Sequence, residues 1–516
     1  MKNFDVITDT EQNNLKLVLK SLLVGIITSF IVIIYRFALS YAEDFAFFIY
    51  NYIKRNIYLI PIWFIILIIF AFIIGKLIDK EPYISGSGIP QVKGIMGGYL
   101  KNRPFSILIN KFIGGTLSII SGLSLGREGP SVQLGACMGD IMSKKLKSTR
   151  LERRLLISSG ATAGLAAAFN APLSGVLFSL EEIYKYFSPL VLLSTITSAI
   201  VSDFVSKHFF GLEPVFHFAD TIPIPLENYW LLLILGILLG VFGAFYNWFT
   251  LKTQNLYNKL KCSTSVKLMI PFLLAGIIGL LFPVVLCGGH AVLEELNLNT
   301  TLTLLLVILI AKFLFSIISF GSGAPGGIFF PLLIIGGTFG AVFGYISINY
   351  LGINAELFNN FIILSMAGYF TAIVRAPITG IILITEMTGS FTHLLSLTIV
   401  SIIAYIVADF LKSAPIYDSL LENLLLKNNI NDYHSHSNKK LIITNVVHFG
   451  SKIENTPLSS IKLPENTLIV SIKRGEDTIV PKGNTVIKAG DTILTMTDLK
   501  DEWKVRELID SLTTIE

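Results

Sequence analysis

Long apolar runs dominate the chain from about residue 18 to about residue 411, and short polar segments separate them. Four runs, at residues 57–78, 230–251, 269–287 and 302–320, are close to the ~20 residues that an α-helix needs to cross a bilayer. This pattern predicts an all-α polytopic membrane protein.

Other apolar stretches are interrupted by glycine and proline, at residues 114–139, 160–180 and 321–344. Irregular backbone at membrane depth persists only where protein buries it or where it lines a watery cavity. Broken helices of this kind favour a transporter or a channel over a simple receptor.

A repeat is visible in the apolar region. Residues 171–177 (APLSGVL) are echoed by residues 376–382 (APITGII), and each copy is followed by an acid, Glu181 or Glu386. A glycine-rich break precedes each copy, at residues 126–130 and 323–327. Two related halves with paired breaks predict a substrate site at their interface, and both parallel and inverted arrangements of the halves are compatible with the pattern.

The composition agrees with a membrane protein, because 53% of the residues are hydrophobic and only 15% are charged. Soluble domains carry roughly 25% charged residues, so an ordinary soluble enzyme and a disordered protein are both excluded. The net charge of +5 is spread along the chain without a basic stripe that would indicate nucleic-acid binding. The cysteines, Cys137, Cys262 and Cys287, lie far apart and predict neither a zinc site nor a disulfide framework.

Three glycine-rich breaks, at residues 86–90 (GSGIP), 126–130 (GREGP) and 327–331 (GIFFP), each precede an apolar helical stretch. Small residues and a proline at a helix start leave backbone N–H groups free to approach a ligand. The positive end of the helix dipole faces the same point. Converging breaks would therefore form an anion site without a buried cation, whereas the alternative is that the glycines only allow close helix packing.

Glu128 lies inside one of these breaks, in apolar surroundings where an unpartnered charge costs ~2.5–3.5 kcal/mol or more. Its carboxylate can receive the same N–H groups as an anion, and protonation would remove its charge. Glu128 is therefore predicted to compete with the anion. The alternative is a local ion pair with Arg127.

The chain changes character after residue 411. Residues 428–440 are polar, and residues 441–516 contain no spanning run. Short β-branched segments at 468–472, 478–480, 485–487 and 492–496 predict strands, and residues 503–512 predict a closing helix. This part is expected to be a small α+β domain. His434 and His436 lie in the polar linker, where a solvated tract is favoured over a metal site.

The three breaks, in this order and at these separations, resemble the signature of the CLC family of chloride channels and chloride/proton antiporters. The resemblance covers roughly residues 18–424. It implies an inverted-repeat fold of tilted and broken helices, and a homodimer with one independent pore in each subunit.

The same resemblance implies roles for individual residues. Ser87 and Tyr417 would offer hydroxyl groups to the chloride ion, and the backbone amides of Ile328 and Phe329 would cradle it. Glu128 matches the external gating glutamate. Glu182 matches the internal proton-transfer glutamate of the exchangers. Without the resemblance, Tyr417 would be read as an interfacial aromatic residue and Glu182 as a surface acid at a helix end.

The presence of both glutamates favours coupled exchange of chloride for protons, and Ser87 favours chloride over nitrate or fluoride. Gln91 departs from the family, in which glutamate often stands after Ile-Pro, and this puts the electrostatic tuning of coupling in doubt. The alternative function is a passive voltage- or pH-gated chloride channel of the same fold. A third hypothesis, from another class, is a ligand sensor whose membrane part is only an anchor.

Residues 441–512 resemble a TrkA-C (RCK C-terminal) domain, through the strand and turn at residues 470–475 and the turn at 489–491. Such domains dimerise, and some bind cyclic di-AMP or another small ligand. Lys462, Ile469 and Pro481 are the candidates for ligand contacts. Their ordinary structural roles would be a surface lysine, a core isoleucine and a turn proline.

The expected organisation is an N-terminal cytoplasmic segment (1–16), a transport domain (17–427), a linker (428–440) and a regulatory domain (441–516). The protein is expected in the cytoplasmic membrane with several spans, in contact with lipid. The basic segment 144–154 is expected on the cytoplasmic side. No nucleophile–base constellation or Walker loop is present, so neither an enzyme nor a cofactor is expected.

Overall fold

The structure, a computed structural model, describes residues 2–185, 187–216, 218, 222–427, 440–475, 477–498 and 502–513. It divides into two compact units, residues 1–423 and 424–516. Each unit is described by itself.

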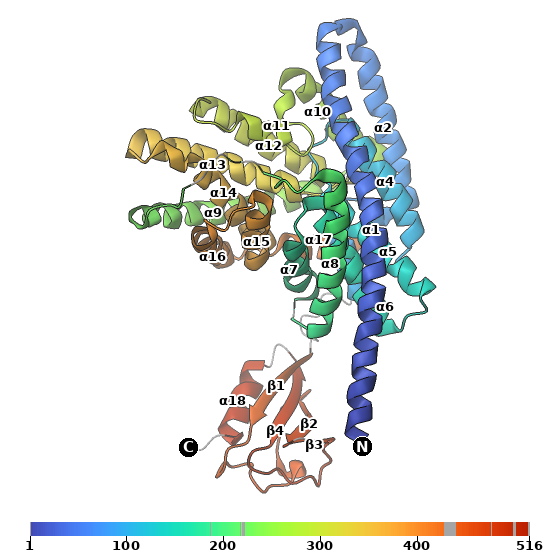
Figure 1. Cartoon of the computed structure of the whole chain (residues 1–516), viewed down its shortest axis with the longest axis vertical. Helices are drawn as coiled ribbons and strands as arrows, with labels where there is room; N and C mark the ends of the chain where they lie inside the picture. The colour runs from blue at the N-terminus through green and yellow to red at the C-terminus, as the bar shows by residue number, and fades with distance from the viewer. Residues whose placement is uncertain are drawn as a thin grey trace. The chain divides into compact units, whose positions relative to one another are not determined.

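The first unit is built from helices (Figure 1). The order of long and short helices in its first half returns in its second half. The first half contains α1 (Lys2–Arg55), α2 (Ile60–Lys80), α3 (Ile89–Met96), α4 (Pro104–Ile120), α5 (Glu128–Lys145), α6 (Arg150–Phe169), α7 (Pro172–Phe178) and α8 (Pro189–Phe210). The second half contains α9 (Tyr229–Lys259), α10 (Thr264–Leu281), α11 (His290–Glu295), α12 (Leu302–Gly321), α13 (Phe329–Leu351), α14 (Phe358–Val374), α15 (Pro377–Thr388) and α16 (Leu394–Phe410), and α17 (Ile416–Lys427) follows.

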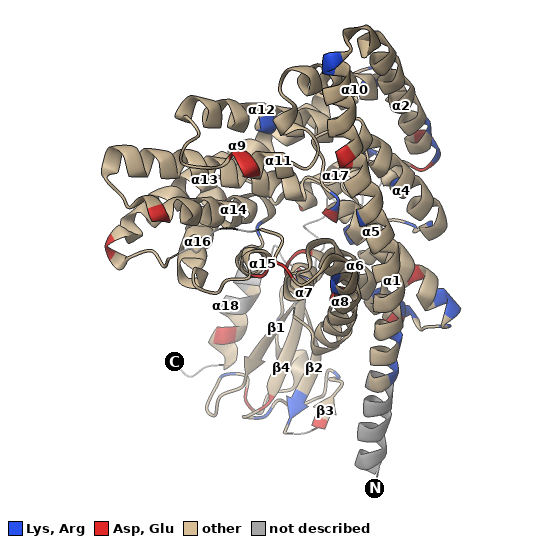
Figure 2. Cartoon of the chain, turned by 45° about the horizontal axis from the view of Figure 1, so that its top comes forward, with Lys and Arg blue, Asp and Glu red and all other residues tan. Residues whose placement is uncertain are grey.

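Among the described residues, eight helices are long and apolar enough to cross a membrane, which confirms the predicted polytopic all-α class. Charged residues are sparse along these helices (Figure 2). The runs predicted at 57–78, 230–251 and 302–320 correspond to α2, α9 and α12. For the run at 269–287 the predicted end of the helix is wrong, because α10 ends at Leu281 and a separate 3-10 turn, Pro283–Val285, follows. Proline cannot continue the hydrogen bonding of the preceding helix.

Proline also determines where several short helices begin. Pro104, Pro172, Pro189 and Pro377 occupy the first turn of α4, α7, α8 and α15. At this position the missing N–H has no helical partner to lose, and the fixed φ angle suits the helix. The repeated Ala-Pro motifs at residues 171–177 and 376–382 therefore start two corresponding helices, α7 and α15.

The second unit contains a four-stranded antiparallel sheet in the order β1-β4-β2-β3, accompanied by α18 (Glu502–Thr513). Its strands are β1 (Lys440–Val446), β2 (Leu468–Arg474), β3 (Asp477–Ile479) and β4 (Thr492–Asp498). Isoleucines from β1, β2 and β4 pack with Val505 and Ile509 of α18 in a separate hydrophobic core.

The strand predicted at 485–487 is wrong, because Val486 makes only an isolated bridge with Pro457. The first strand of the sheet, β1, was not predicted.

Candidate functional site

The three glycine-rich breaks meet in the first unit. The Gly126 N–H donates to the Gly327 carbonyl at 2.7 Å, and the Gly327 N–H donates to the Gly126 carbonyl at 2.8 Å. The third break joins them, because Gly86 accepts from the Gly326 N–H at 3.1 Å. These bonds hold the starts of α3, α5 and α13 around one region.

Glycine is required where these segments touch most closely. Gly88 has φ +100°, a conformation that other residues rarely adopt. A Cβ at Gly129 would overlap the Ser87 hydroxyl and would lie 2.8 Å from the Ser87 carbonyl oxygen. The start of α5 is therefore packed directly against Ser87.

The predicted chloride-binding residues lie in this region. The Tyr417 hydroxyl lies near the Ser87 hydroxyl, both residues are buried, and neither hydroxyl has a hydrogen-bond partner. The ring of Phe178 lies between Phe329 and Tyr417, with centroid distances of 5.9 Å and 6.2 Å. Buried Ile328 and Phe329 form the start of α13, where the first N–H groups have no helical acceptor. Free donors and apolar walls together suit a desolvated anion.

Glu128 is the first residue of α5 and is fully buried, and neither of its carboxylate oxygens has a hydrogen-bond partner. Its carboxylate faces the N–H of Phe330 on α13 without completing a hydrogen bond. The nearest cation is Arg127, whose Nε lies 3.8 Å from Oε1. This long contact is the local ion pair considered as the alternative, and it leaves the carboxylate available to other partners.

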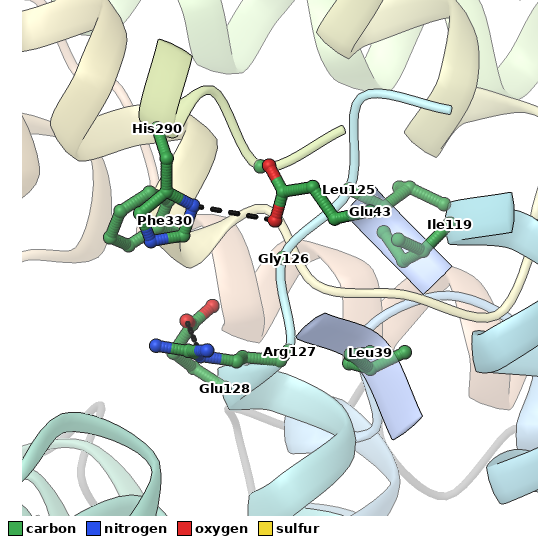
Figure 3. A pocket seen from close by; sticks show the side chains of 10 residues that line it. Leu39, Glu43, Ile119, Leu125, Gly126, Arg127, Glu128, His290 and Phe330 are labelled. Carbon is green, nitrogen blue, oxygen red and sulfur yellow. Dashed lines mark ion pairs between the residues drawn. The ribbon is translucent and has the colours of Figure 1, made fainter. Parts of the chain in front are cut away.

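Glu128 lines a small cavity that it shares with a second pair of ionisable residues (Figure 3). Glu43 of α1 lies 3.5 Å from Nδ1 of His290, and the imidazole of His290 stacks on Phe330 with the ring centroids 4.3 Å apart. Sequence reasoning missed both residues, because each is far from the glycine motifs along the chain. They place a carboxylate and an imidazole in the same small cavity as the Glu128 side chain.

Glu182 lies in a π-helical turn, Ser179–Tyr184, that follows α7. Its side chain is 2% exposed, and its Oε1 accepts from Nζ of Lys93 at 2.5 Å. Lys93 also donates to Asp418 Oδ1 at 2.5 Å. Neither Lys93 nor Asp418 was predicted, and the available signal was a lysine in the short apolar helix directly after the GSGIP motif.

The repeated acids Glu181 and Glu386 form two reciprocal clamps between the halves. Glu181 accepts from the N–H of Ile378 (3.2 Å) and of Thr379 (2.7 Å) at the start of α15. Glu386 accepts from the N–H of Leu173 (3.1 Å) and of Ser174 (2.8 Å) at the start of α7. Each half thus caps the corresponding helix of the other, as expected for halves related by a two-fold axis.

In the second unit, Lys462 is exposed, Pro481 is partly buried, and Ile469 is 3% exposed within the hydrophobic core. The Ile469 side chain therefore has the core role considered as its alternative. Asp491 accepts from both Nε and Nη2 of Arg474 at 2.8 Å. Burial alone would raise the pKa of Asp491, but these bonds and the Lys488 N–H hold that pKa below its ordinary value.

The described residues contain no group of three or more His, Cys, Asp or Glu side chains that would hold a metal ion. His434 and His436 lie outside the described residues.

Comparison with known proteins gives the same family for most of the chain. Residues 70–409 match the family described as voltage gated chloride channel, and residues 444–510 match the TrkA-C domain. The chain is 37% identical over 394 residues to the H(+)/Cl(-) exchange transporter ClcA of Vibrio vulnificus (strain YJ016), covering 73% of this chain and 83% of the relative. It is 33% identical over 434 residues to ClcA of Salmonella newport (strain SL254), covering 81% and 90%.

Solved structures are similar as well. A slow cyanobacterial Cl-/H+ antiporter superposes with a TM-score of 0.73 at 30% identity, covering 80% of this chain and 99% of that one. A CLC-type fluoride/proton antiporter shares the fold, with a TM-score of 0.64 at 23% identity over 78% of this chain and 96% of the other.

Proposed function

The chain belongs to the voltage gated chloride channel family, and we propose that it is an antiporter that exchanges chloride for protons. It is a multi-pass protein of the cytoplasmic membrane. The observation that carries the proposal is the buried Glu128 carboxylate, which has no hydrogen-bond partner and faces the start of a neighbouring helix near Ser87. Exchange also needs a second proton site, for which Glu182 is the candidate.

Chloride binds between the hydroxyls of Ser87 and Tyr417 and the amides of Ile328 and Phe329. These donors are neutral, so they stabilise the anion without the tight ion pair that a lysine would form. Desolvated hydrogen-bond donors and helix N-termini are effective anion ligands because the surrounding dielectric is low.

Ionised Glu128 competes with chloride for the N–H groups at the helix starts. Protonation removes the charge of the carboxylate, so the side chain leaves and chloride enters from outside. Loss of the proton returns the carboxylate to the N–H groups. The movement of chloride through the site therefore requires that Glu128 gains or loses a proton.

Glu182 exchanges protons with the cytoplasm and passes them toward Glu128 through water. Protons therefore bind in turn to the two glutamates along one route, whereas chloride takes a different route past Ser87 and Tyr417. Removal of either carboxyl group should abolish proton coupling while chloride movement continues.

The test is simultaneous recording of chloride and pH in vesicles that contain the purified full chain. An outward chloride gradient, with equal pH on the two sides at the start, should drive protons into the vesicles and so build up a proton gradient. The Glu128→Ala and Glu182→Gln variants should still move chloride but no longer move protons. The exposed residue Glu227, replaced by glutamine, serves as the control. Chloride movement in the wild type without any proton flux would instead select the passive channel.

The proposal extends to assembly and to the second unit. The transporter acts as a homodimer with one pore in each subunit, and mass measurement of the detergent-solubilised protein tests the dimer.

The second unit regulates transport by binding a small ligand, and the TrkA-C match supports this role. A calorimetric titration of residues 434–516 with cyclic di-AMP should give a saturable signal, and the absence of a signal would remove that ligand.

A further inference from the structure

Four side chains of alternating charge are linked in one chain beside Glu182, and they are called the inner charge cluster here. Lys93 donates to Glu182 and to Asp418, at 2.5 Å in each case, and Lys185 pairs with the other carboxylate oxygen of Asp418. The Lys93 and Glu182 side chains are 6% and 2% exposed, whereas those of Asp418 and Lys185 are 25% and 46% exposed. The cluster therefore leads from a buried carboxyl group to solvent.

Lys93 has two acidic partners, and only one of them is the proton-transfer glutamate. A buried ammonium group without a counterion is strongly unfavourable. When Glu182 takes up a proton, its carboxyl group no longer neutralises Lys93, but Asp418 still does. Asp418 therefore keeps Lys93 charged and in place in both protonation states of Glu182.

The cluster is also connected to the candidate anion site through the backbone. Lys93 belongs to α3, which begins directly after the GSGIP turn that carries Ser87. Asp418 directly follows Tyr417 on α17. Lys93, which pairs with Glu182, and Asp418, which pairs with Lys93, thus lie close in sequence to the two residues that carry the hydroxyl donors.

Other charged groups near Glu182 form hydrogen bonds with partners other than Glu182. Glu181 and Arg375 line the same cavity as Glu182 and Lys185. Glu181 is bound to the start of α15, and Arg375 donates to the carbonyls of Tyr405 and Ser413. Lys93 is the one described cation that is paired directly with the Glu182 carboxylate.

We propose that Lys93 is a positioning residue for proton transfer at Glu182, and that Asp418 anchors it. The inference rests on the proposed function, because it assigns to Glu182 a proton that must be taken up and released in each cycle. Lys93 holds the ionised carboxylate toward the cytoplasmic opening and favours release of the proton. Asp418 limits this effect by sharing the charge of Lys93, so that Glu182 can be protonated again.

The two partners should have opposite effects on the pH dependence of transport. Lys93→Met removes the cation, so the pH at which proton transport is half-maximal should rise by about one unit, and proton flux well below that pH should fall up to about tenfold. Asp418→Asn leaves the whole charge of Lys93 to Glu182, so the half-maximal pH should fall. Lys93→Arg keeps the charge and should restore most of the wild-type profile.

The experiment measures proton and chloride flux of the full chain in vesicles across a range of pH, with Lys101→Met as an exposed control. Chloride binding by calorimetry identifies the variants that remain folded. If Lys93→Met does not fold, the pH profiles of Asp418→Asn and Lys93→Arg are compared with that of the wild type instead. Opposite shifts for the Lys93→Met and Asp418→Asn variants support the proposal. Unchanged profiles, or equal loss of both fluxes without a shift, overturn it.

The same recordings test the proposed function separately from the role of Lys93. A wild type that moves no protons against their gradient rejects the antiporter. A coupled wild type with a Lys93→Met profile identical to its own rejects only the role of Lys93.

Discussion

Replacement of Glu386 by glutamine should destabilise the membrane unit by about 1–3 kcal/mol, because hydrogen bonds to a charged acceptor are worth roughly 1.5–3 kcal/mol each. Glu386 accepts from the N–H of Leu173 at 3.1 Å, and from the N–H and hydroxyl of Ser174 at 2.8 Å and 2.5 Å. A glutamine keeps one acceptor oxygen and turns an amide donor toward the remaining donors. The position is partly exposed, which reduces the cost below the sum of the separate bonds.

The corresponding replacement of Glu181 should cost about the same. Glu181 accepts from the N–H of Ile378, and from the N–H and hydroxyl of Thr379, the last two at 2.7 Å. Because the clamps are reciprocal, the two single variants should lose similar amounts of unfolding free energy.

Denaturant unfolding of the full chain in detergent, followed by fluorescence, measures both free energies. Glu227→Gln, at an exposed position in a 3-10 turn, is the matched control and should be neutral. Wild-type stability in both clamp variants, or a loss in only one of them, would refute the argument that the clamps join the halves equivalently.

Gly129→Ala should weaken chloride binding about tenfold or more, since overpacking costs roughly 1–3 kcal/mol and the new methyl group would displace Ser87. Calorimetric titration measures this, and Gly483→Ala, which meets only ordinary contacts, is the control. In the second unit, Asp491 has a folded pKa below the unfolded value of about 3.9, so its stabilisation is present above that value and is lost as the pH falls through the folded pKa. Asp491→Asn should therefore lower the stability of residues 440–516 by about 1–2 kcal/mol at neutral pH, because it breaks the pair with Arg474. Circular dichroism should find that this difference becomes smaller as the pH falls below about 3.9. A difference independent of pH would contradict this assignment.

Features with a local physical cause could be predicted from the sequence. Apolar runs of spanning length gave α2, α9 and α12, because the bilayer fixes the length of a helix. The glycine-rich breaks were recognisable because few residues allow close backbone approach and positive φ angles. The repeat predicted a substrate site at the interface of the two halves, although the sequence did not decide how those halves are oriented. The place of Ser87 in that site was implied only by the resemblance to the CLC family.

Features that depend on distant partners could not be predicted. In the sequence, Lys93 is only a charged residue within a short apolar helix. Its role becomes visible only in the fold, which brings Glu182 and Asp418 beside it. The segment at 485–487 has strand-like residues, yet Ile487 donates to the carbonyl of Thr456 and Thr485 accepts from Leu458, the first residue of a 3-10 helix, so its partners are not in a strand. Tertiary pairing therefore decided the conformation against local propensity.

Two buried lysines bear on how the proposed anion site, which is built from neutral donors, becomes electrostatically favourable. Nζ of Lys111 donates to the carbonyls of Ile84 and Gly86 at 2.8 Å and 2.5 Å, directly before Ser87. Nζ of Lys312 donates to the carbonyls of Val285 and Cys287 at 3.0 Å and 2.9 Å in the corresponding turn of the second half. Each ammonium group binds the negative ends of peptide dipoles. In the first half, the charge of Lys111 lies against the backbone directly before Ser87 and favours an anion in the proposed site, without the direct ion pair that would slow the release of chloride.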